Sequence, residues 1–382
     1  MPAKNMLGII GLEYQLPSLY INQEEVANNI DFEVDKIKIG LGLEQMGVPS
    51  RREDAISLAL NAVSRLIKKY KVNPLDVGRL EVGTESNPDG SKSIKSYLTD
   101  LFPGNTSICG CDSVHACYSG TNALLNAVAW MESPLWDGRL AIVVATDVAM
   151  YKDKNCQPTG GAGAVAILLG PNCIYRIVPS SIIHYFTNQF DFMKPKGLHP
   201  FPIVKGKESI ENYRTAFEVC YEEFKKKVGD METFDYIALH SPYTRLPEKI
   251  CVANHIDRKK FLKSLEASRK NGNAYSASLY LSLISLLDGH DGEIGEKILL
   301  FSYGSGTSSS MFCLERVSKG CMVTGFKERL SERKKISYQE FIKLVEDPVP
   351  QDNYEPQEKV YSPGYHLKRI ASFGRYYECL TE

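Results

Sequence analysis

Hydrophobic and polar positions along the chain follow two patterns, one typical of buried strands and one typical of helices. Residues 139–151 (RLAIVVATDVAMY) and 297–304 (KILLFSYG) are almost continuously apolar, as strands covered on both faces are. Residues 54–70 and 209–227 instead repeat apolar side chains every three to four positions, which is the period of an amphipathic helix. The alternation of such strands and helices predicts an α/β fold in which helices cover the sheets.

The same order of elements occurs twice along the chain. Each half runs from a helix to a strand with a polar end, then through a turn into a second helix, and then through two strands joined by a glycine turn. This echo predicts a duplicated α/β fold with one site between its halves. We expect three parts: residues 1–172 with Glu85 and Cys117, residues 173–320 with His240 and the NGN and YGSG turns, and an appendage, residues 321–382, that completes the second half.

Two segments lie outside this repeated pattern. Residues 186–210, rich in aromatic residues, proline and lysine, are predicted to form a long loop that crosses between the halves. The appendage is charged and contains several prolines, and Ser337 and Glu340 have the spacing of a capping box. We therefore expect one helix there, on the surface.

Composition and charge exclude several classes of protein. The 382 residues are 43% hydrophobic and 24% charged with a net charge of −1, so nothing favours binding to nucleic acid or to an anionic membrane. No apolar run approaches the roughly eighteen residues of a membrane span, and the N-terminus resembles a core strand more than a targeting signal. Ten cysteines without regular spacing and seven histidines without a metal motif predict reduced thiols, a cytoplasmic protein and no metal.

One of the ten cysteines has the sequence context of a nucleophile. Cys117 lies in HACYSGT, just before a predicted helix, where backbone N–H groups stabilise a thiolate. Ala116, Ser119 and Gly120 are small and leave room for a substrate at the sulfur. The alternative is a structural cysteine packed under the helix, which is the usual role of a buried cysteine.

A nucleophilic thiol requires partner groups, and two polar strand ends offer them. Glu85 ends a strand in the first half and His240 ends the corresponding strand in the second half. Taken singly, Glu85 could be a solvated strand end and His240 a loop or capping residue. Their convergence with Cys117 in a duplicated fold favours a catalytic site. The glycine turns join strands, so they suit close approach to a ligand or donation of N–H groups better than a nucleotide cradle.

A family resemblance extends over nearly the whole chain. The motifs EVGTE, ACYSGT, PTGGAGAVA, HSPY, NGN and FSYGSG occur in this order, with GIIGLEYQLPSLYINQEEV near the start and YHLKRI near the end. Together they resemble hydroxymethylglutaryl-CoA (HMG-CoA) synthases of the eukaryotic type, in the thiolase-like superfamily. The resemblance implies two similar halves stacked as α-β-α-β-α layers and a homodimer. It also implies condensation of acetyl-CoA with acetoacetyl-CoA and water to HMG-CoA and CoA, in the mevalonate pathway, without cofactor.

The resemblance also implies roles for individual residues. Cys117 corresponds to the nucleophile that carries the acetyl group, Glu85 to the general base, and His240 to the group that orients and polarises acetoacetyl-CoA. The amides of Cys117 and Ser305 correspond to oxyanion donors. The remaining matches are to substrate-contacting positions: Asn155, Thr159, Ser209, Asn273, Arg245 and Lys249. The resemblance places the two basic residues near the phosphates of CoA, and the alternative for both is a solvated helix face.

The chain departs from the family pattern near these motifs. Ser119 replaces the usual glycine, His115 the usual asparagine, and the turn reads KNCQPTGG instead of GNARPTGG. Two other functions remain open from the sequence. Another thiolase-fold condensing enzyme is disfavoured because those enzymes pair their cysteine with histidines or a His/Cys set, where this chain has Glu85. An inactive acyl-CoA-binding homologue is disfavoured because cysteine, glutamate and histidine are all retained.

Overall fold

A 10-stranded sheet connects the two halves of the protein. The structure, a computed structural model, describes residues 6–195 and 201–381. The strand order is β12-β13-β14-β8-β1-β7-β6-β4-β5, and β9 pairs with β14. Strand β8 (Tyr175–Ile177) bonds to β1 (Leu7–Gln15) of the first half and to β14 (Ser308–Arg316) of the second. The other strands are β4 (Val77–Gly83), β5 (Asp112–Ser113), β6 (Leu140–Ala149), β7 (Gly161–Pro171), β9 (Ile183–Phe186), β12 (Tyr236–Leu239) and β13 (Lys297–Gly304).

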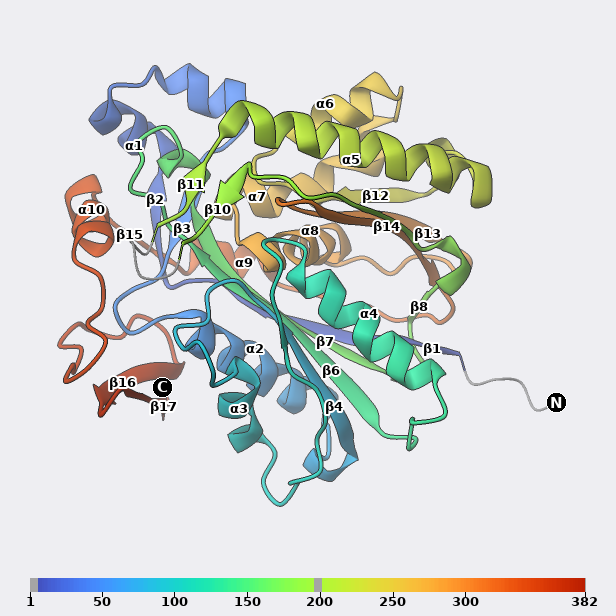
Figure 1. Cartoon of the computed structure of the whole chain (residues 1–382), viewed down its shortest axis with the longest axis horizontal. Helices are drawn as coiled ribbons and strands as arrows, with labels where there is room; N and C mark the ends of the chain where they lie inside the picture. The colour runs from blue at the N-terminus through green and yellow to red at the C-terminus, as the bar shows by residue number, and fades with distance from the viewer. Residues whose placement is uncertain (1–5, 196–200, 382) are drawn as a thin grey trace.

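Helices cover both faces of each half, so that helices and strands stack in the expected α-β-α-β-α order (Figure 1). The middle layer contains α4 (Ser119–Glu132) and α8 (Ser278–Leu287), whose apolar side chains share one core with strands of both halves. All residues of α8 are buried, which explains why its sequence is apolar on every side. On the outer faces lie α2 (Ala55–Tyr70) and α3 (Ile94–Leu98) below, and α5 (Gly206–Lys227) and α6 (Arg245–Ala253) above.

The strands and helices predicted from the sequence are largely present. Helix α2 begins after Asp54, whose side chain forms a reciprocal capping box with Ser57. The predicted glycine turn before β7 is shorter than expected, because Gly161 already belongs to the strand. A Cβ atom on Gly161 would lie 2.4 Å from the backbone oxygen of Asn271, so this strand packs directly against the backbone of the NGN turn.

The predicted crossing loop contains regular structure, which corrects the sequence interpretation. Strands β10 (Phe192–Met193) and β11 (Ile203–Val204) pair antiparallel within it, and α5 already begins at Gly206. Residues 196–200 of the predicted loop lie outside the described residues. The pairing of β10 with β11 brings the end of β10 toward the region between the halves.

The C-terminal appendage packs mainly on the first half, whereas we expected it to complete the second. Its helix α9 (Phe326–Ser331) contacts the second half through Asp288, which accepts from the Phe326 amide. The later elements contact the first half, because the apolar face of α10 covers an apolar cluster there. These elements are β15 (Lys334–Lys335), paired with β2 (Leu19–Asn22); α10 (Tyr338–Glu346), packed on α1 (Gln23–Ile30) and β3 (Gln45–Val48); and the hairpin of β16 (Gly364–Ala371) and β17 (Gly374–Leu380) on α2.

The predicted capping box of the appendage is present. Ser337 Oγ accepts a hydrogen bond from the Glu340 amide at 3.2 Å, and Glu340 Oε2 accepts from the Ser337 amide at 2.8 Å. Among the helices within residues 6–195 and 201–381, none combines the length and the apolar character that crossing a membrane would require.

Candidate active site

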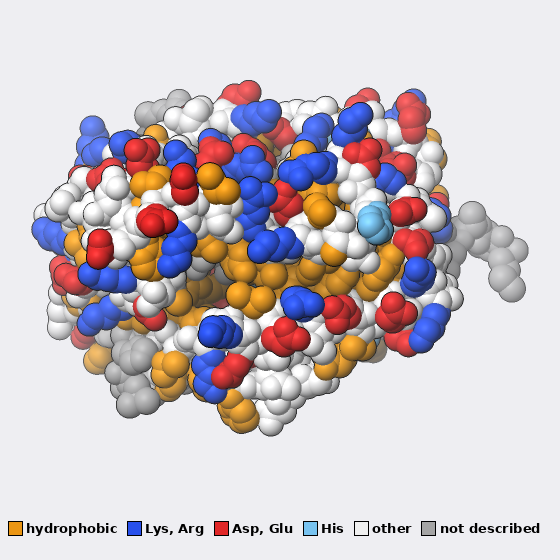
Figure 2. Space-filling model, turned by 90° about the horizontal axis from the view of Figure 1, so that it is seen from above, with side chains coloured by type: hydrophobic (Ala, Val, Ile, Leu, Met, Phe, Trp, Pro, Cys, Tyr) orange, Lys and Arg blue, Asp and Glu red, His pale blue; other side chains and the backbone are white. Residues whose placement is uncertain are grey.

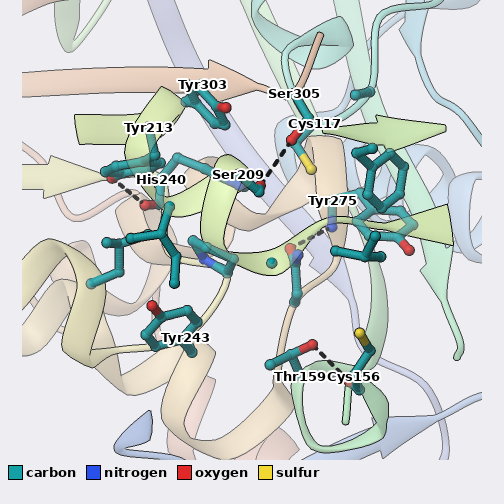
Figure 3. A pocket seen from close by; sticks show the side chains of 18 of the residues that line it. Cys117, Cys156, Thr159, Ser209, Tyr213, His240, Tyr243, Tyr275, Tyr303 and Ser305 are labelled. Atoms are coloured by element: carbon teal, nitrogen blue, oxygen red, sulfur yellow. Dashed lines mark hydrogen bonds between the residues drawn. The ribbon is translucent and has the colours of Figure 1, made fainter. Parts of the chain in front are cut away.

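A cavity of about 240 Å³ opens where the two halves meet. Figure 3 shows side chains from both halves pointing into it, with an aromatic wall that includes Tyr213, Tyr243, Tyr275 and Tyr303. Most of the site residues predicted from the sequence line this cavity. They are Cys117, Asn155, Thr159, Ser209, His240, Asn273 and Ser305.

Cys117 lies at the cavity wall just before α4. The preceding residue, Ala116, has a φ of 42°, a left-handed conformation that costs energy for a residue with a Cβ atom. Ser119 Oγ donates to the Ala116 carbonyl at 3.0 Å and thereby supports this turn. The Cys117 sulfur is presented 3.9 Å from Glu85 Oε1.

The expected stabilisation of a Cys117 thiolate by the helix start is opposed by burial. Burial raises the pKa of this thiol well above its usual value, and the carboxylates of Glu85 and Asp147 raise it further. A helix terminus contributes about 0.3–1 kcal/mol at an exposed site, whereas burying an unpaired charge costs several kcal/mol. Burial and the two carboxylates therefore favour the protonated thiol.

Glu85 is a buried carboxylate and not a solvated strand end. Its side chain is only 7% exposed, and Lys194 Nζ lies 3.1 Å from Oε2. Burial raises the pKa of Glu85 to about 7, Lys194 opposes this rise, and Asp147 adds to it. A carboxyl group with a pKa near neutrality can both accept and release a proton under physiological conditions.

Asp147 holds Glu85 in place and was not singled out in the sequence. Its Oδ1 atom accepts from the Glu85 amide at 2.8 Å and from Thr84 Oγ1 at 2.9 Å, and its Oδ2 atom accepts from the Ser276 amide at 2.9 Å. Asp147 is fully buried, and these bonds connect the end of β4 to the start of the α8 region in the second half. The signal was present as an acidic residue inside an otherwise apolar strand.

His240 is a buried, neutral imidazole at the end of β12. It is 2% exposed, and burial lowers its pKa to about 3. Its carbonyl accepts from Tyr213 Oη at 2.6 Å, while its Nδ1 has no hydrogen-bond partner among the described residues. The ring therefore makes no capping hydrogen bond through Nδ1 within the described part of the chain. The ring lies among the cavity side chains in Figure 3, so it can offer a substrate one hydrogen bond without carrying a charge.

The YGSG turn packs against the segment that carries Cys117. A Cβ atom on Gly304 would lie 2.5 Å from the backbone nitrogen of Tyr118, so only glycine permits this approach. Ser305 follows, and its hydroxyl lies 3.3 Å from that of Ser209 on α5. Ser305 and Cys117 thus line one cavity; that their amides act as oxyanion donors stays a prediction.

Three further predicted residues line the cavity from turns. Asn155 Nδ2 donates to Asp153 at 3.0 Å, and Thr159 Oγ1 donates to the Cys156 carbonyl at 2.8 Å. Asn273 Oδ1 accepts from the Tyr275 amide at 2.9 Å. These bonds fix the turns that form the cavity wall, so a role in substrate contact remains a prediction for all three.

The departures from the family pattern lie in ordered surroundings. His115 Nε2 is buried without a hydrogen-bond partner among the described residues, and it lies beside Gly306 of the YGSG turn. Cys156 lines the cavity as a second thiol, and burial raises its pKa to about 11. Gln157 accepts from Tyr338 Oη at 3.1 Å and thereby connects the KNCQPTGG turn to α10 of the appendage.

Arg245 and Lys249 do not line the cavity. Arg245 begins α6, forms an ion pair with Glu248 at 2.5 Å and donates to the Ile39 carbonyl at 2.8 Å. It lines a separate hollow of about 220 Å³ together with Lys38, Arg258 and Arg269, while Lys249 is exposed on the same helix. On the upper face of the molecule, Figure 2 shows Lys and Arg side chains around a band of hydrophobic ones.

The fold and the site together define a class of protein. Two similar halves enclose a cavity whose wall presents a thiol and a neutral imidazole, and a buried carboxylate lies beside the thiol. This is the arrangement of a thiolase-like protein that handles acyl groups through a cysteine.

Comparison with known proteins identifies the family. The models of the hydroxymethylglutaryl-coenzyme A synthase N-terminal and C-terminal regions match residues 3–174 and residues 180–254 and 248–379. Hydroxymethylglutaryl coenzyme A synthase of Fusarium sp is 40% identical over 84% of this chain and 82% of its own length. Hydroxymethylglutaryl-CoA synthase 2 of Blattella germanica is 36% identical and covers 97% of both chains. The chain belongs to the hydroxymethylglutaryl-CoA synthase family.

Solved structures agree with this assignment. MvaS in complex with 3-hydroxy-3-methylglutaryl coenzyme A aligns with a TM-score of 0.86 at 28% identity, over 99% of this chain and all of that one. A crystal structure of HMG-CoA synthase complexed with CoA has a TM-score of 0.89 at 24% identity, covering 98% of this chain and 100% of that one, and supports the fold alone.

Proposed function

We propose that this chain condenses acetyl-CoA with acetoacetyl-CoA and water to give HMG-CoA and CoA, in the mevalonate pathway. One observation carries the proposal: a buried carboxylate, Glu85, lies 3.9 Å from the sulfur of Cys117. A thiol beside a carboxylate with a pKa near neutrality suits two steps: formation of an acetyl thioester, and removal of a proton from the methyl group of that acetyl group.

The first step is transfer of the acetyl group to Cys117. A bond forms between the sulfur and the acetyl carbon, the bond to CoA breaks, and CoA leaves with the proton of the thiol. The carbonyl oxygen gains negative charge during this transfer. The amides of Cys117 and Ser305 are the donors that we assign to it, since preorganised N–H groups stabilise such charge.

The second step forms the carbon–carbon bond. Glu85 removes a proton from the methyl group of acetyl-Cys117, and the resulting enolate attacks the ketone carbon of acetoacetyl-CoA. His240 orients the ketone and polarises it by a hydrogen bond from its neutral ring. The ketone oxygen takes up the proton that Glu85 removed, which returns Glu85 to its ionised form. Water then hydrolyses the thioester to Cys117, which restores the thiol and releases HMG-CoA with a free carboxylate.

Residues around the cavity are assigned to substrate contact. Asn155, Thr159, Ser209 and Asn273 line the cavity, and we assign them to contact with the acyl groups. Arg245 and Lys249 lie outside it on α6, where they suit the phosphates of CoA because guanidinium and ammonium groups bind phosphate strongly. The hollow beside Arg245 contains the further basic residues Lys38, Arg258 and Arg269, and it is also lined by Glu44 and by Glu248, which pairs with Arg245 and Arg258.

An assay of CoA release tests the proposed function against its alternatives. Free thiol should appear rapidly only when acetyl-CoA and acetoacetyl-CoA are present together. A different thiolase-like condensing enzyme would release CoA with another pair of acyl substrates, and an inactive homologue would bind CoA thioesters without releasing thiol. Absence of thiol release with both substrates present would contradict the proposal.

Replacement of His240 should separate the two half-reactions. In His240→Ala, Cys117 should still take up an acetyl group, because the imidazole acts on the second substrate. Condensation should fall by about 10²-fold or more, as is typical when a positioned catalytic group is lost, and the acetoacetyl-CoA concentration needed should rise. Normal condensation and normal acetoacetyl-CoA dependence in His240→Ala, measured by steady-state kinetics, would disprove this role.

We also propose a cytoplasmic homodimer. The short strand β5 forms one edge of the 10-stranded sheet, and the adjacent Val114 is 72% exposed. An edge strand with an exposed apolar neighbour suits pairing with a second copy of the chain. A mouse relative at 34% identity is described as cytoplasmic. Sedimentation at micromolar concentration should show a dimer, and a purely monomeric protein would contradict the proposal. Recovery of the protein in an organelle fraction would contradict the proposed compartment.

A further inference from the structure

Lys194 contacts the proposed base, although none of the steps above uses it. It follows β10 in the segment that connects the two halves. Its Nζ lies 3.1 Å from Glu85 Oε2 and 3.4 Å from the Glu85 carbonyl oxygen, and 4.6 Å above the centre of the Tyr275 ring. The side chain is 25% exposed, so this ion pair is largely shielded from water.

The contacts of Lys194 fix the orientation of the Glu85 carboxylate. Lys194 holds Oε2, while the other oxygen, Oε1, lies 3.9 Å from the Cys117 sulfur. On the backbone side, Asp147 accepts from the Glu85 amide at 2.8 Å. Glu85 is therefore held at both ends, and only Oε1 faces the atom that would carry the acetyl group.

We propose that Lys194 is a positioning residue for Glu85. The ammonium group of Lys194 turns Glu85 Oε1 toward acetylated Cys117 and favours the ionised carboxylate at neutral pH. This inference rests on the proposed function and deepens it. Lys194 directly follows the strand whose Phe192 lines the cavity, so the connecting segment supplies both a wall residue and a charge.

The charges around Glu85 give this lysine a specific effect. Asp147 on β6 and the Cys117 thiol face the carboxyl group, and the hydroxyls of Tyr151 and Tyr275 lie close to it. Burial and Asp147 raise the pKa of Glu85, and Lys194 is the largest influence that lowers it, leaving a value of about 7. Loss of the ammonium group raises the pKa of Glu85. Because the base acts in its deprotonated form, the acidic limb of the condensation rate should then move to higher pH.

The test is the pH dependence of condensation in Lys194→Met and Lys194→Gln. Each pH unit by which the acidic limb of the pH–rate profile moves upward lowers the condensation rate about tenfold at pH values below the limb. We therefore expect the variants to lose about tenfold or more in rate at neutral pH and to regain most of that rate in alkaline solution. Lys194→Gln keeps a hydrogen-bond donor without the charge and should show the same shift. Lys194→Arg keeps the charge and should retain a limb close to that of the wild type.

Two controls make the outcome specific. Both uncharged variants should still take up acetyl at Cys117 from acetyl-CoA, which shows that the site is folded. Lys226→Met removes a lysine that pairs with Glu223 on the surface of α5 and should leave the profile unchanged. An unshifted limb, an equal loss of rate at every pH, or loss of acetylation in both variants would overturn the role of Lys194. Absence of condensation in the wild type would instead contradict the proposed function.

Discussion

Glu85→Ala should form the acetyl-enzyme and yet fail to condense it. The thiol of Cys117 remains available for acetyl transfer, but no group remains 3.9 Å from the sulfur to take the methyl proton. Loss of a positioned base typically costs about 10²–10⁴ in rate. Intact mass after incubation with acetyl-CoA measures the first half-reaction, and formation of HMG-CoA measures the second.

Hydrogen exchange provides an independent measure of the same step. In deuterated solvent, the methyl hydrogens of bound acetyl groups should exchange in the wild type and not in Glu85→Ala. Glu85→Gln should behave in the same way, because an amide of nearly the same shape is not a base. Glu223→Ala, which removes an exposed glutamate on α5, is the matched control. Condensation near the wild-type rate in Glu85→Ala would mean that another residue is the base.

Cys117→Ala should lose both acetylation and condensation. Without the sulfur no thioester forms, and the enolate has no attachment beside Glu85. Cys117→Ser should also fail, since a hydroxyl is a much poorer nucleophile than a thiol. Intact mass and peptide mapping after incubation with acetyl-CoA locate the acetyl group.

A second thiol in the cavity provides a stringent control for this prediction. Cys156 lines the same cavity, and burial raises its pKa as it raises that of Cys117, so protonation does not distinguish the two thiols. What distinguishes Cys117 is its sulfur's position 3.9 Å from Glu85 Oε1. In Cys156→Ala the acetyl group should still be found on Cys117. Acetyl transfer to Cys156 or to any other cysteine in the wild type would contradict the assignment of Cys117.

Much of the fold could be predicted because its signals are local. Continuous apolar runs indicated the central strands, and the apolar sequence of α8 agrees with burial on all sides. The polar ends of two such strands indicated Glu85 and His240, and the small residues after Cys117 indicated an accessible sulfur. These predictions depend on strand ends and on helix starts, which sequence patterns define well.

Tertiary effects explain what the sequence did not provide. Lys194 reaches Glu85 from a position 109 residues away, and Asp147 joins the two halves by bonds to Glu85 and Ser276. The pKa of Cys117 depends on burial and on two carboxylates that the fold brings close, and the local helix-start argument could not include these effects. The appendage pairs with β2, a contact between the two ends of the chain that no local pattern indicates.

A single-turnover chase tests most directly whether acetyl-Cys117 is the intermediate of a condensation with acetoacetyl-CoA. The enzyme is loaded with isotopically labelled acetyl-CoA, freed of excess substrate, and mixed with unlabelled acetoacetyl-CoA. Mass spectrometry should show the label leaving Cys117 and appearing in HMG-CoA, with one labelled product for each acetyl group lost. Label that leaves Cys117 only as free acetate or acetyl-CoA, with no labelled HMG-CoA, would contradict the proposed reaction.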